Sequence, residues 1–457
     1  MKKERIITTV SAVMCLILFA LMLTLSGIYM AKSRGINIGG NGTVSEDVLS
    51  ELKYGKSLLD DGFDLDCILP SAIAYKTESD GKVYGIMCES SEILSLCNFF
   101  SAVVSGIFGE EYECRVAESE DFLSALESDN FIYFSFKSDF NDYIISAFFG
   151  GSIPTGSQSG ERITLSEMVI TFEAENNYFI PTAYTKNVGG EYFSLSAVEE
   201  SGRLKIEVSD FNTWLTGTSS AECEFAIESD ERLSASQLIF EENIKTAAIS
   251  LTQTDPSVDT ELYLSLFDYN KNKLNTYTEG DDTNVYIEGH GILRISSDGV
   301  EYNANDGGGI PLYAIAGYTS SGSYSVYEDI AACCRICEKI CETGYSGGLR
   351  LEIGEIYYSS GKLIIDFICL YDNCVIYSNG EPLSAISFEI ENNYITHAEI
   401  SIYSCAAGAE TINLTQLSAL PYIVDDGKKY ENGRMSIGYD LTGFGEVLCG
   451  EWIYEVK

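Results

Sequence analysis

The hydrophobic positions fall into one long apolar run near the N-terminus and many short runs after it. Residues 6–31 contain no charged residue over 26 positions, and a helix needs about 20 apolar residues to cross a bilayer's hydrocarbon core. A cleaved signal peptide has an apolar region of only about 7–15 residues. The run therefore predicts an uncleaved transmembrane anchor within residues 1–31, with a cleaved signal peptide as the alternative.

Basic residues flank this run on both sides, three before it and two within the next three positions. The slight excess before the run favours a cytoplasmic N-terminus. No later apolar run approaches membrane length. We therefore expect a single-pass protein of the cell membrane that contacts lipid through this helix and has its C-terminal part outside the cytoplasm.

The short runs after the anchor predict a mixture of helices and strands. Residues 32–44 are rich in glycine and small polar residues, which is typical of a flexible tether, and a helix is expected from Ser45. Helices are also predicted at residues 92–107 and 119–128, the latter opening with Ser, Glu and Asp in the order of a helix N-cap. Residues 131–137 (FIYFSFK) form a continuous apolar run that predicts a buried strand.

Hairpins are predicted further along the chain. Residues 354–371 have β-rich arms around a Ser-Ser-Gly turn. Residues 170–178 and 386–394 are identical at seven of nine positions, and both lead into an Asn-Asn pair suited to a type I′ turn. The echo is explained either by two independent hairpins or by a duplicated module. In both cases surface turns are expected rather than active sites.

These elements predict an α+β fold with antiparallel sheets and packed helices. At about 150 residues per domain, a chain of 457 residues has room for two or three folded units behind the anchor. We expect an N-terminal extracytoplasmic domain at residues 45–225, a middle module at 226–305 and a C-terminal module at 306–457.

The composition supports a folded chain and restricts its partners. Hydrophobic residues make up 45% and only 7 residues are proline, unlike a disordered chain. The net charge of −41 repels phosphate backbones, so nucleic acid is not expected as a partner. Solubility explains this charge most simply; an acidic docking face or cation binding is the alternative, and a partner surface should be neutral or basic.

Four of the 14 cysteines fall within one predicted helix at residues 327–341. On a helix Cys334, Cys337 and Cys341 share a stripe, whereas Cys333 lies about 100° from Cys334, so the four cannot meet at one ion without a partner element. Small apolar core residues explain the stripe best, with disulfide or metal use as alternatives. The 13 cysteines outside the anchor are scattered unlike a disulfide framework.

No motif predicts catalysis, a cofactor or a metal site. His290 and His397 lack a neighbouring nucleophile or ligand pattern and are expected to be ordinary surface or strand residues. Glycine clusters lack the Lys-Ser/Thr of a P-loop, and no carboxylate pair is singled out among 69 acidic residues. We therefore assign no catalytic, cofactor-binding or metal-binding residues.

Three segments, together with the single anchor, resemble the YycH family: residues 119–136, 277–302 and 363–400. The resemblance lies in the order and texture of the elements, and the last segment is similar to the strand-rich terminal module of YycH and YycI. It implies a non-enzymatic membrane-anchored regulator that contacts a sensor histidine kinase of a two-component system, usually alongside a related accessory protein. The cysteine content and acidity of this chain depart from the family.

Regulation by contact is thus the leading hypothesis. An extracytoplasmic structural or envelope-assembly protein that acts by protein–protein contact is the alternative. A membrane-tethered hydrolase is the third class, and it would require a deep pocket with perturbed carboxylates or a Cys-His pair.

Overall fold

The computed structural model describes residues 68–455, apart from residues 78–80, 88–89, 109–111, 150–162, 176–177, 188, 198–205, 208–219, 227–235, 241–242, 271–273, 281, 306–307, 313–325 and 417–433. The expected anchor, the tether and the helix predicted from Ser45 lie outside these residues. None of the helices that the structure does describe is long and apolar enough to cross a membrane.

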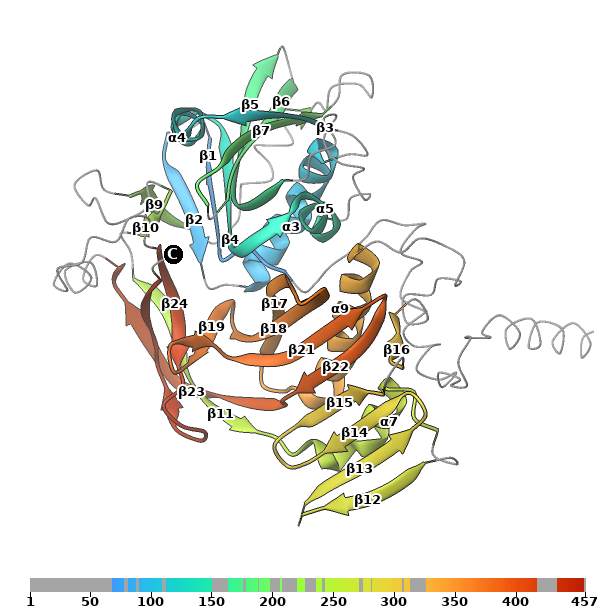
Figure 1. Ribbon diagram of the computed structural model, residues 1–457. Helices are drawn as coiled ribbons and strands as arrows, with labels where there is room; N and C mark the ends of the chain where they lie inside the picture. Colours follow the sequence, from blue (N-terminus) through green and yellow to red (C-terminus); the bar gives the residue numbers. More distant parts are fainter. Residues whose placement is uncertain are drawn as a thin grey trace, which may run out of the picture.

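The first sheet takes its strands from the N-terminal half of the chain (Figure 1). Its order in the described residues is β10 (Leu238–Phe240), β9 (Ala221–Phe225), β2 (Val83–Met87), β1 (Ala72–Lys76), β4 (Phe131–Asn141), β5 (Thr164–Glu175), β6 (Tyr178–Lys186), β7 (Tyr192–Ala197) and β3 (Tyr112–Ala117), with β8 (Ile206–Glu207) paired to β6. All of its pairings are antiparallel.

Helices cover both faces of this sheet, which explains the continuous apolar run in β4. Helix α3 (Ser90–Ile107) packs against β2, β6, β7 and α5 (Asp142–Phe148), whereas α4 (Ser119–Glu127) packs against β4, β5 and β6. Ile132 and Phe134 join the core on the α3 side, and Phe131 and Tyr133 join Phe122 of α4 on the other. The predicted buried strand is therefore confirmed, because side chains on both faces of β4 are removed from water.

The second sheet is formed by the C-terminal half and lies beside the first (Figure 1). Its described order is β12 (Asn275–Glu279), β13 (Thr283–Glu288), β14 (Gly291–Ile295), β15 (Val300–Ala304), β22 (Tyr394–Ile400), β21 (Ser384–Glu391), β18 (Lys362–Tyr371), β19 (Cys374–Ser378), β24 (Arg434–Asp440) and β26 (Gly450–Glu455). Three further strands pair with its members: β16 (Ile310–Pro311) with β22, β17 (Leu349–Ser359) with β18, and β20 (Glu381–Pro382) with β19. The β19–β24 pairing is parallel.

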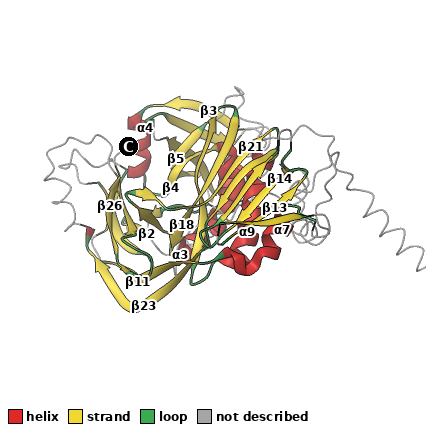
Figure 2. Cartoon of the chain, turned by 60° about the horizontal axis from the view of Figure 1, so that its bottom comes forward, coloured by secondary structure: helices red, strands yellow, loops and turns green. Residues whose placement is uncertain are grey.

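A small third sheet and three further helices complete the described fold (Figure 2). The sheet has the order β23 (Tyr403–Leu414), β11 (Ile244–Gln253) and β25 (Val447–Leu448). The helices are the 3-10 helix η2 (Pro256–Asp259), α7 (Thr260–Leu266) and α9 (Val326–Gly344). Helix α9 packs against β17 and β21, and its buried residues belong to one apolar cluster that extends from the first sheet into the second.

Within the described residues, the predicted helices and hairpins are found, with one correction at the N-cap of a helix. The predicted helices at residues 92–107, 119–128 and 327–341 correspond to α3, α4 and α9. The N-cap of α4 is Glu118 rather than Ser119. The reason is that the Glu118 backbone N–H donates to Asp121 Oδ2 at 3.0 Å, which satisfies an otherwise free donor at the helix start.

The two related Asn-Asn segments both form antiparallel hairpins, with the same pairing next to the turn and a bulge further along only in the second. Glu175 faces Tyr178 in β5–β6, and Glu391 faces Tyr394 in β21–β22. In the second hairpin Asn392 and its neighbour have φ values of 53° and 66°, as a type I′ turn requires; the first Asn-Asn pair lies outside the described residues. The structure is compatible with either origin of the echo.

The division into an N-terminal domain, a middle module and a C-terminal module remains a prediction. Strand pairing joins β9 and β10 across residue 225. Within residues 226–305, β11 pairs with β23 of the third sheet, whereas β12 to β15 belong to the second sheet. Sheet membership therefore connects segments that lie far apart in the sequence.

Candidate functional site

The two large sheets meet at a buried polar contact centred on Lys137. This residue lies in β4 where the pairing with β5 shifts register between Ser135 and Phe140. Its Nζ donates to Leu69 O at 3.2 Å, to Glu352 Oε2 at 2.7 Å and to Asn373 Oδ1 at 2.8 Å. An ammonium group has three N–H donors. Lys137 therefore links the first sheet, β17 and the turn after β18, and we call Lys137, Glu352 and Asn373 the junction cluster.

The ion pair in this cluster is removed from water. The Lys137 side chain is 9% exposed and that of Glu352 is 2% exposed. Arg350 Nε lies 3.3 Å from Glu352 Oε1, without the alignment of a hydrogen bond, and its side chain is 25% exposed. Desolvation of a buried pair can offset its attraction, but loss of one partner leaves an uncompensated charge. The contact between the sheets is therefore sensitive to any change in either partner.

The Asn373 side chain binds a second backbone carbonyl, that of Pro70. It follows Asp372 in the turn between β18 and β19, and both have positive φ values, 46° and 63°, which asparagine and aspartate tolerate better than most residues. The Asn373 Nδ2 group donates to Pro70 O at 2.8 Å while its Oδ1 accepts from Lys137. One side chain thus connects the second sheet to both the entering chain and the first sheet.

Residues 68–71, the first described segment of the chain, are held between the two sheets. Its last residue donates from the Ser71 backbone N–H and Oγ to Ser135 O, at 2.6 and 2.9 Å. Nearby, Ser138 Oγ donates to Gly354 O at 2.6 Å and joins β4 directly to β17. We call residues 68–71 the entry segment.

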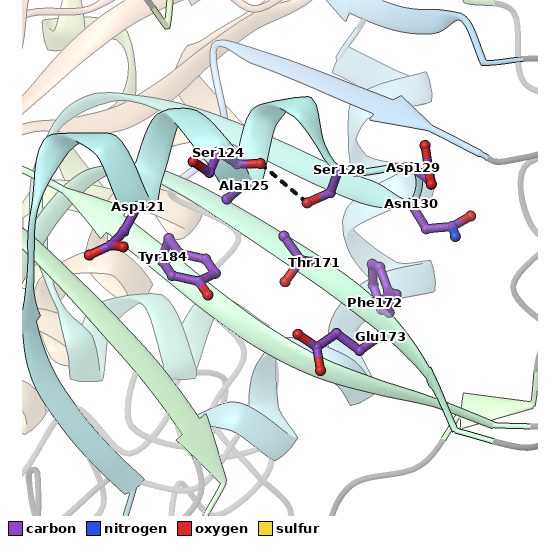
Figure 3. A pocket seen from close by; sticks show the side chains of 10 residues that line it. All are labelled: Asp121, Ser124, Ala125, Ser128, Asp129, Asn130, Thr171, Phe172, Glu173 and Tyr184. Carbon is purple, nitrogen blue, oxygen red and sulfur yellow. Dashed lines mark hydrogen bonds between the residues drawn. The ribbon is translucent and has the colours of Figure 1, made fainter.

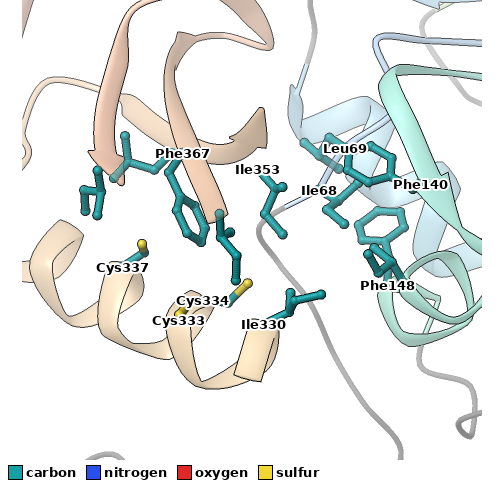
Figure 4. Packing of buried hydrophobic residues seen from close by; sticks show 14 of the residues in the cluster. Ile68, Leu69, Phe140, Phe148, Ile330, Cys333, Cys334, Cys337, Ile353 and Phe367 are labelled. Carbon is teal, nitrogen blue, oxygen red and sulfur yellow. The ribbon is translucent and has the colours of Figure 1, made fainter. Parts of the chain in front are cut away.

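The apolar side chains of the entry segment fill the space between the sheets (Figure 4). Ile68 and Leu69 are each 1% exposed. In Figure 4 they lie near Phe148 of α5, with Ile330 of α9 and Ile353 of β17 on the side of the second sheet. The core of the molecule is therefore continuous through the entry segment.

The buried thiol of Cys97 is influenced by the charges of the junction cluster. Cys97 of α3 is 2% exposed, and burial raises the pKa of its thiol well above the ordinary value, with smaller effects from the charges of Arg350, Glu352 and Lys137. Its thiol is therefore buried within electrostatic reach of the junction cluster.

A separate groove of about 490 Å³ lies between α4 and the strands β5 and β6 (Figure 3). Its lining includes the exposed carboxylates of Asp121, Asp129 and Glu173 and contains no basic residue. Burial raises the pKa of the Tyr184 hydroxyl, and the charges of Glu173 and Asp121 raise it further. The groove is therefore negative, which suits a cationic group.

The cysteines of α9 are core residues, as predicted. Cys333, Cys334 and Cys337 are at most 1% exposed and Cys341 is half-buried, and none of the four forms a disulfide. Cys333 is buried together with Cys334 because the apolar arc of α9 is broader than the stripe expected from the sequence. Among the described residues no group of three or more His, Cys, Asp or Glu is placed to hold a metal ion.

Each of the two histidines contacts a neighbouring segment of the fold. His397 lies in β22, with Nδ1 2.8 Å from Asn303 Oδ1. His290 lies in the turn between β13 and β14, half-buried, with Nε2 2.9 Å from Phe267 O. Burial lowers the pKa of the His290 imidazole, an effect partly opposed by the hydrogen bond to Phe267 and by the charge of Glu288.

The sequence did not single out the junction cluster. Lys137 ends the predicted buried strand at residues 131–137, and a charge at the end of an apolar run is usually solvated. Its partner Glu352 is 215 positions away. The available clue was a lysine inside a longer strand pattern, because a buried lysine in a strand needs an acceptor from elsewhere in the fold.

Comparison with solved structures places this architecture among known folds. No family model matches the sequence, and no curated protein matches it either. The crystal structure of YycH from Bacillus subtilis is similar, with a TM-score of 0.51 over 87% of this chain and 96% of that chain, at 12% identity. The described α+β architecture of antiparallel sheets is thus a YycH-like fold, which agrees with the resemblance seen in the sequence.

Proposed function

We propose that this protein is a non-enzymatic, membrane-anchored regulator that modulates a sensor histidine kinase of a cell-envelope two-component system. The observation that supports this most is the YycH-like fold, which extends over 87% of the chain. The apolar run at residues 6–31 supplies the expected anchor. In this proposal the N-terminus is cytoplasmic and the folded part extracytoplasmic.

The regulator acts by contact rather than by chemistry. It shifts the kinase between two signalling states only as far as it binds one state more tightly than the other. The anchor helix and the extracytoplasmic part both contribute to this difference, and a related accessory protein joins the complex. Because the chain has a net charge of −41, the partner surface that faces the folded part is neutral or basic.

Affinity capture from solubilised membranes tests the proposal. The full chain is compared with a variant in which residues 6–31 are replaced by an unrelated apolar helix of the same length. We expect the full chain to recover a membrane histidine kinase, and the variant to recover several-fold less. Equal amounts of both chains in the membrane fraction provide the control.

The outcomes separate the hypotheses. Undiminished capture of the kinase by the variant would count against control through the anchor helix. Recovery of wall components or other extracytoplasmic domains, with no kinase in either sample, would instead support the envelope-assembly alternative. Recovery of the chain from the soluble fraction without its first thirty or so residues would exclude the anchor.

A further inference from the structure

The entry segment is the first described part of the chain after the expected anchor, and it binds both sheets. Two consecutive carbonyls, those of Leu69 and Pro70, accept hydrogen bonds from Lys137 and Asn373. Lys137 belongs to the first sheet, and Asn373 belongs to the turn after β18 in the second. These two hydrogen bonds therefore attach the entry segment to both sheets at once.

The position of the entry segment and the contact between the sheets depend on the same two side chains, Lys137 and Asn373. If the entry segment leaves its place, Lys137 and Asn373 each lose an acceptor in a buried site, which is costly. The polar contacts between the sheets then include the Lys137–Glu352 pair, the Lys137–Asn373 bond and the Ser138–Gly354 bond. Separation of the sheets, in turn, removes the Asn373 bond that holds the segment. Each event makes the other easier, as linkage requires.

We propose that the entry segment is a strap that couples the chain leading to the membrane anchor to the contact between the two sheets. With the strap seated, the junction cluster is satisfied and the sheets stay in contact. With the strap released, the junction opens locally. The proposal deepens the proposed function in one respect only: it takes residues 6–31 as the anchor, which precedes the strap in the chain.

Asn373→Gly tests the second-sheet side of this coupling. Glycine adopts the positive φ of 63° without strain, so the variant removes the two side-chain bonds while it keeps the turn. Asn379→Gly is the matched control, because Asn379 has a φ of 56° in an exposed turn away from the cluster. Both variants are made in the full chain and purified in detergent micelles.

The readout is native-state labelling of Cys97 by a thiol reagent, followed by mass spectrometry. We expect Asn373→Gly to raise the Cys97 labelling rate about tenfold, since two buried hydrogen bonds are lost, and to raise amide exchange at Ser71. Asn379→Gly should change neither. Cys223, which is buried on the opposite face of the first sheet, should keep its rate in all chains, which distinguishes local opening from global unfolding.

A milder variant tests the bond between the strap and the first sheet. It also provides a test of the coupling if Asn373→Gly does not fold. Ser71→Ala removes the Oγ bond to Ser135 O, and we expect Cys97 labelling to rise about threefold. Ser166→Ala is its control, since Ser166 Oγ also donates to a backbone carbonyl of this sheet, that of Lys186. Unchanged Cys97 labelling in Ser71→Ala, or in a folded Asn373→Gly chain, would overturn the proposal.

The experiment contains no kinase, so it is independent of the proposed partner. Faster Cys97 labelling together with a failed kinase capture would refute the proposed function and leave the coupling standing. Successful capture of the kinase with unchanged Cys97 labelling would support the proposed function and refute the coupling.

Discussion

The sharpest stability prediction concerns the ion pair that joins the two sheets. In Lys137→Met the unbranched methionine keeps most of the volume of the lysine stem but removes the ammonium group. Glu352, whose side chain is 2% exposed, then has only Arg350 as an ion-pair partner, at 3.3 Å and without the alignment of a hydrogen bond. Breaking a buried pair in this way costs about 3–5 kcal/mol. That is a large share of the roughly 5–15 kcal/mol of a typical folded protein.

An exposed ion pair of the first sheet gives the matched control. Lys82 Nζ and Glu222 Oε2 are 2.6 Å apart, but their side chains are 51% and 45% exposed. Lys82→Met should therefore cost only about 0–1 kcal/mol, because water screens the pair and the side chains lose entropy on forming it. The two lysine variants have the same chemistry and differ chiefly in burial.

Urea unfolding of the full chain in detergent micelles, followed by far-UV circular dichroism, measures both costs. A double variant, Lys137→Met with Glu352→Gln, should recover more than half of the loss, because the stranded carboxylate is the main source of the cost. The reasoning would be refuted by a Lys137→Met cost below about 1 kcal/mol, or by a double variant no more stable than the single one.

Two further predictions address pH and backbone conformation. The pKa of His290 is lower in the folded chain than its ordinary value of 6.5. As the pH falls, the unfolded chain therefore binds the proton before the folded chain does. The stability that comes from the neutral imidazole is complete above pH 6.5 and is lost as the pH falls through the folded-state pKa. We expect His290→Gln to reduce the loss of stability between pH 7.5 and pH 5 in urea titrations, and parallel profiles would contradict this assignment. Gly347 has a φ of 78°, and a Cβ there would lie 1.6 Å from Cys405 O, so Gly347→Ala should cost more than about 3 kcal/mol in the same assay. Gly361→Ala, at a φ of 84° with nothing within 4 Å of the added Cβ, should cost only about 1–2 kcal/mol; equal costs would show that the close approach of the backbone at Gly347 is unimportant.

The local elements could be predicted from the sequence because their causes are local. The run at residues 131–137 predicted a buried strand, and the structure shows that strand buried on both faces, which α3, α5 and α4 cover. The Asn-Asn pair at residues 392–393 predicted a type I′ turn, and its φ values have the required sign. Helix α4 starts at Ser119 as predicted, but its N-cap is Glu118, because the choice of N-cap depended on a hydrogen bond from the Glu118 backbone N–H to Asp121.

The candidate site could not be predicted in the same way. Its bonds join residues separated by 215 positions for Lys137 and Glu352, 236 for Lys137 and Asn373, and 303 for Asn373 and Pro70. No periodicity connects such positions. In the sequence, Lys137 looks like a solvated strand end and Asn373 like an ordinary turn residue, and both descriptions are locally reasonable.

By itself, the sequence determined the apolar run that predicts an anchor, the helices α3, α4 and α9 with several strands, and the core role of the cysteines in α9, because each depends on hydrophobic spacing within one segment. Only the tertiary structure decided that the entry segment, β4, β17 and the turn after β18 meet at one buried lysine. The physical reason is that a buried charge takes its partners from whichever segments the packing of the two sheets brings within hydrogen-bond distance, however far apart they lie along the chain.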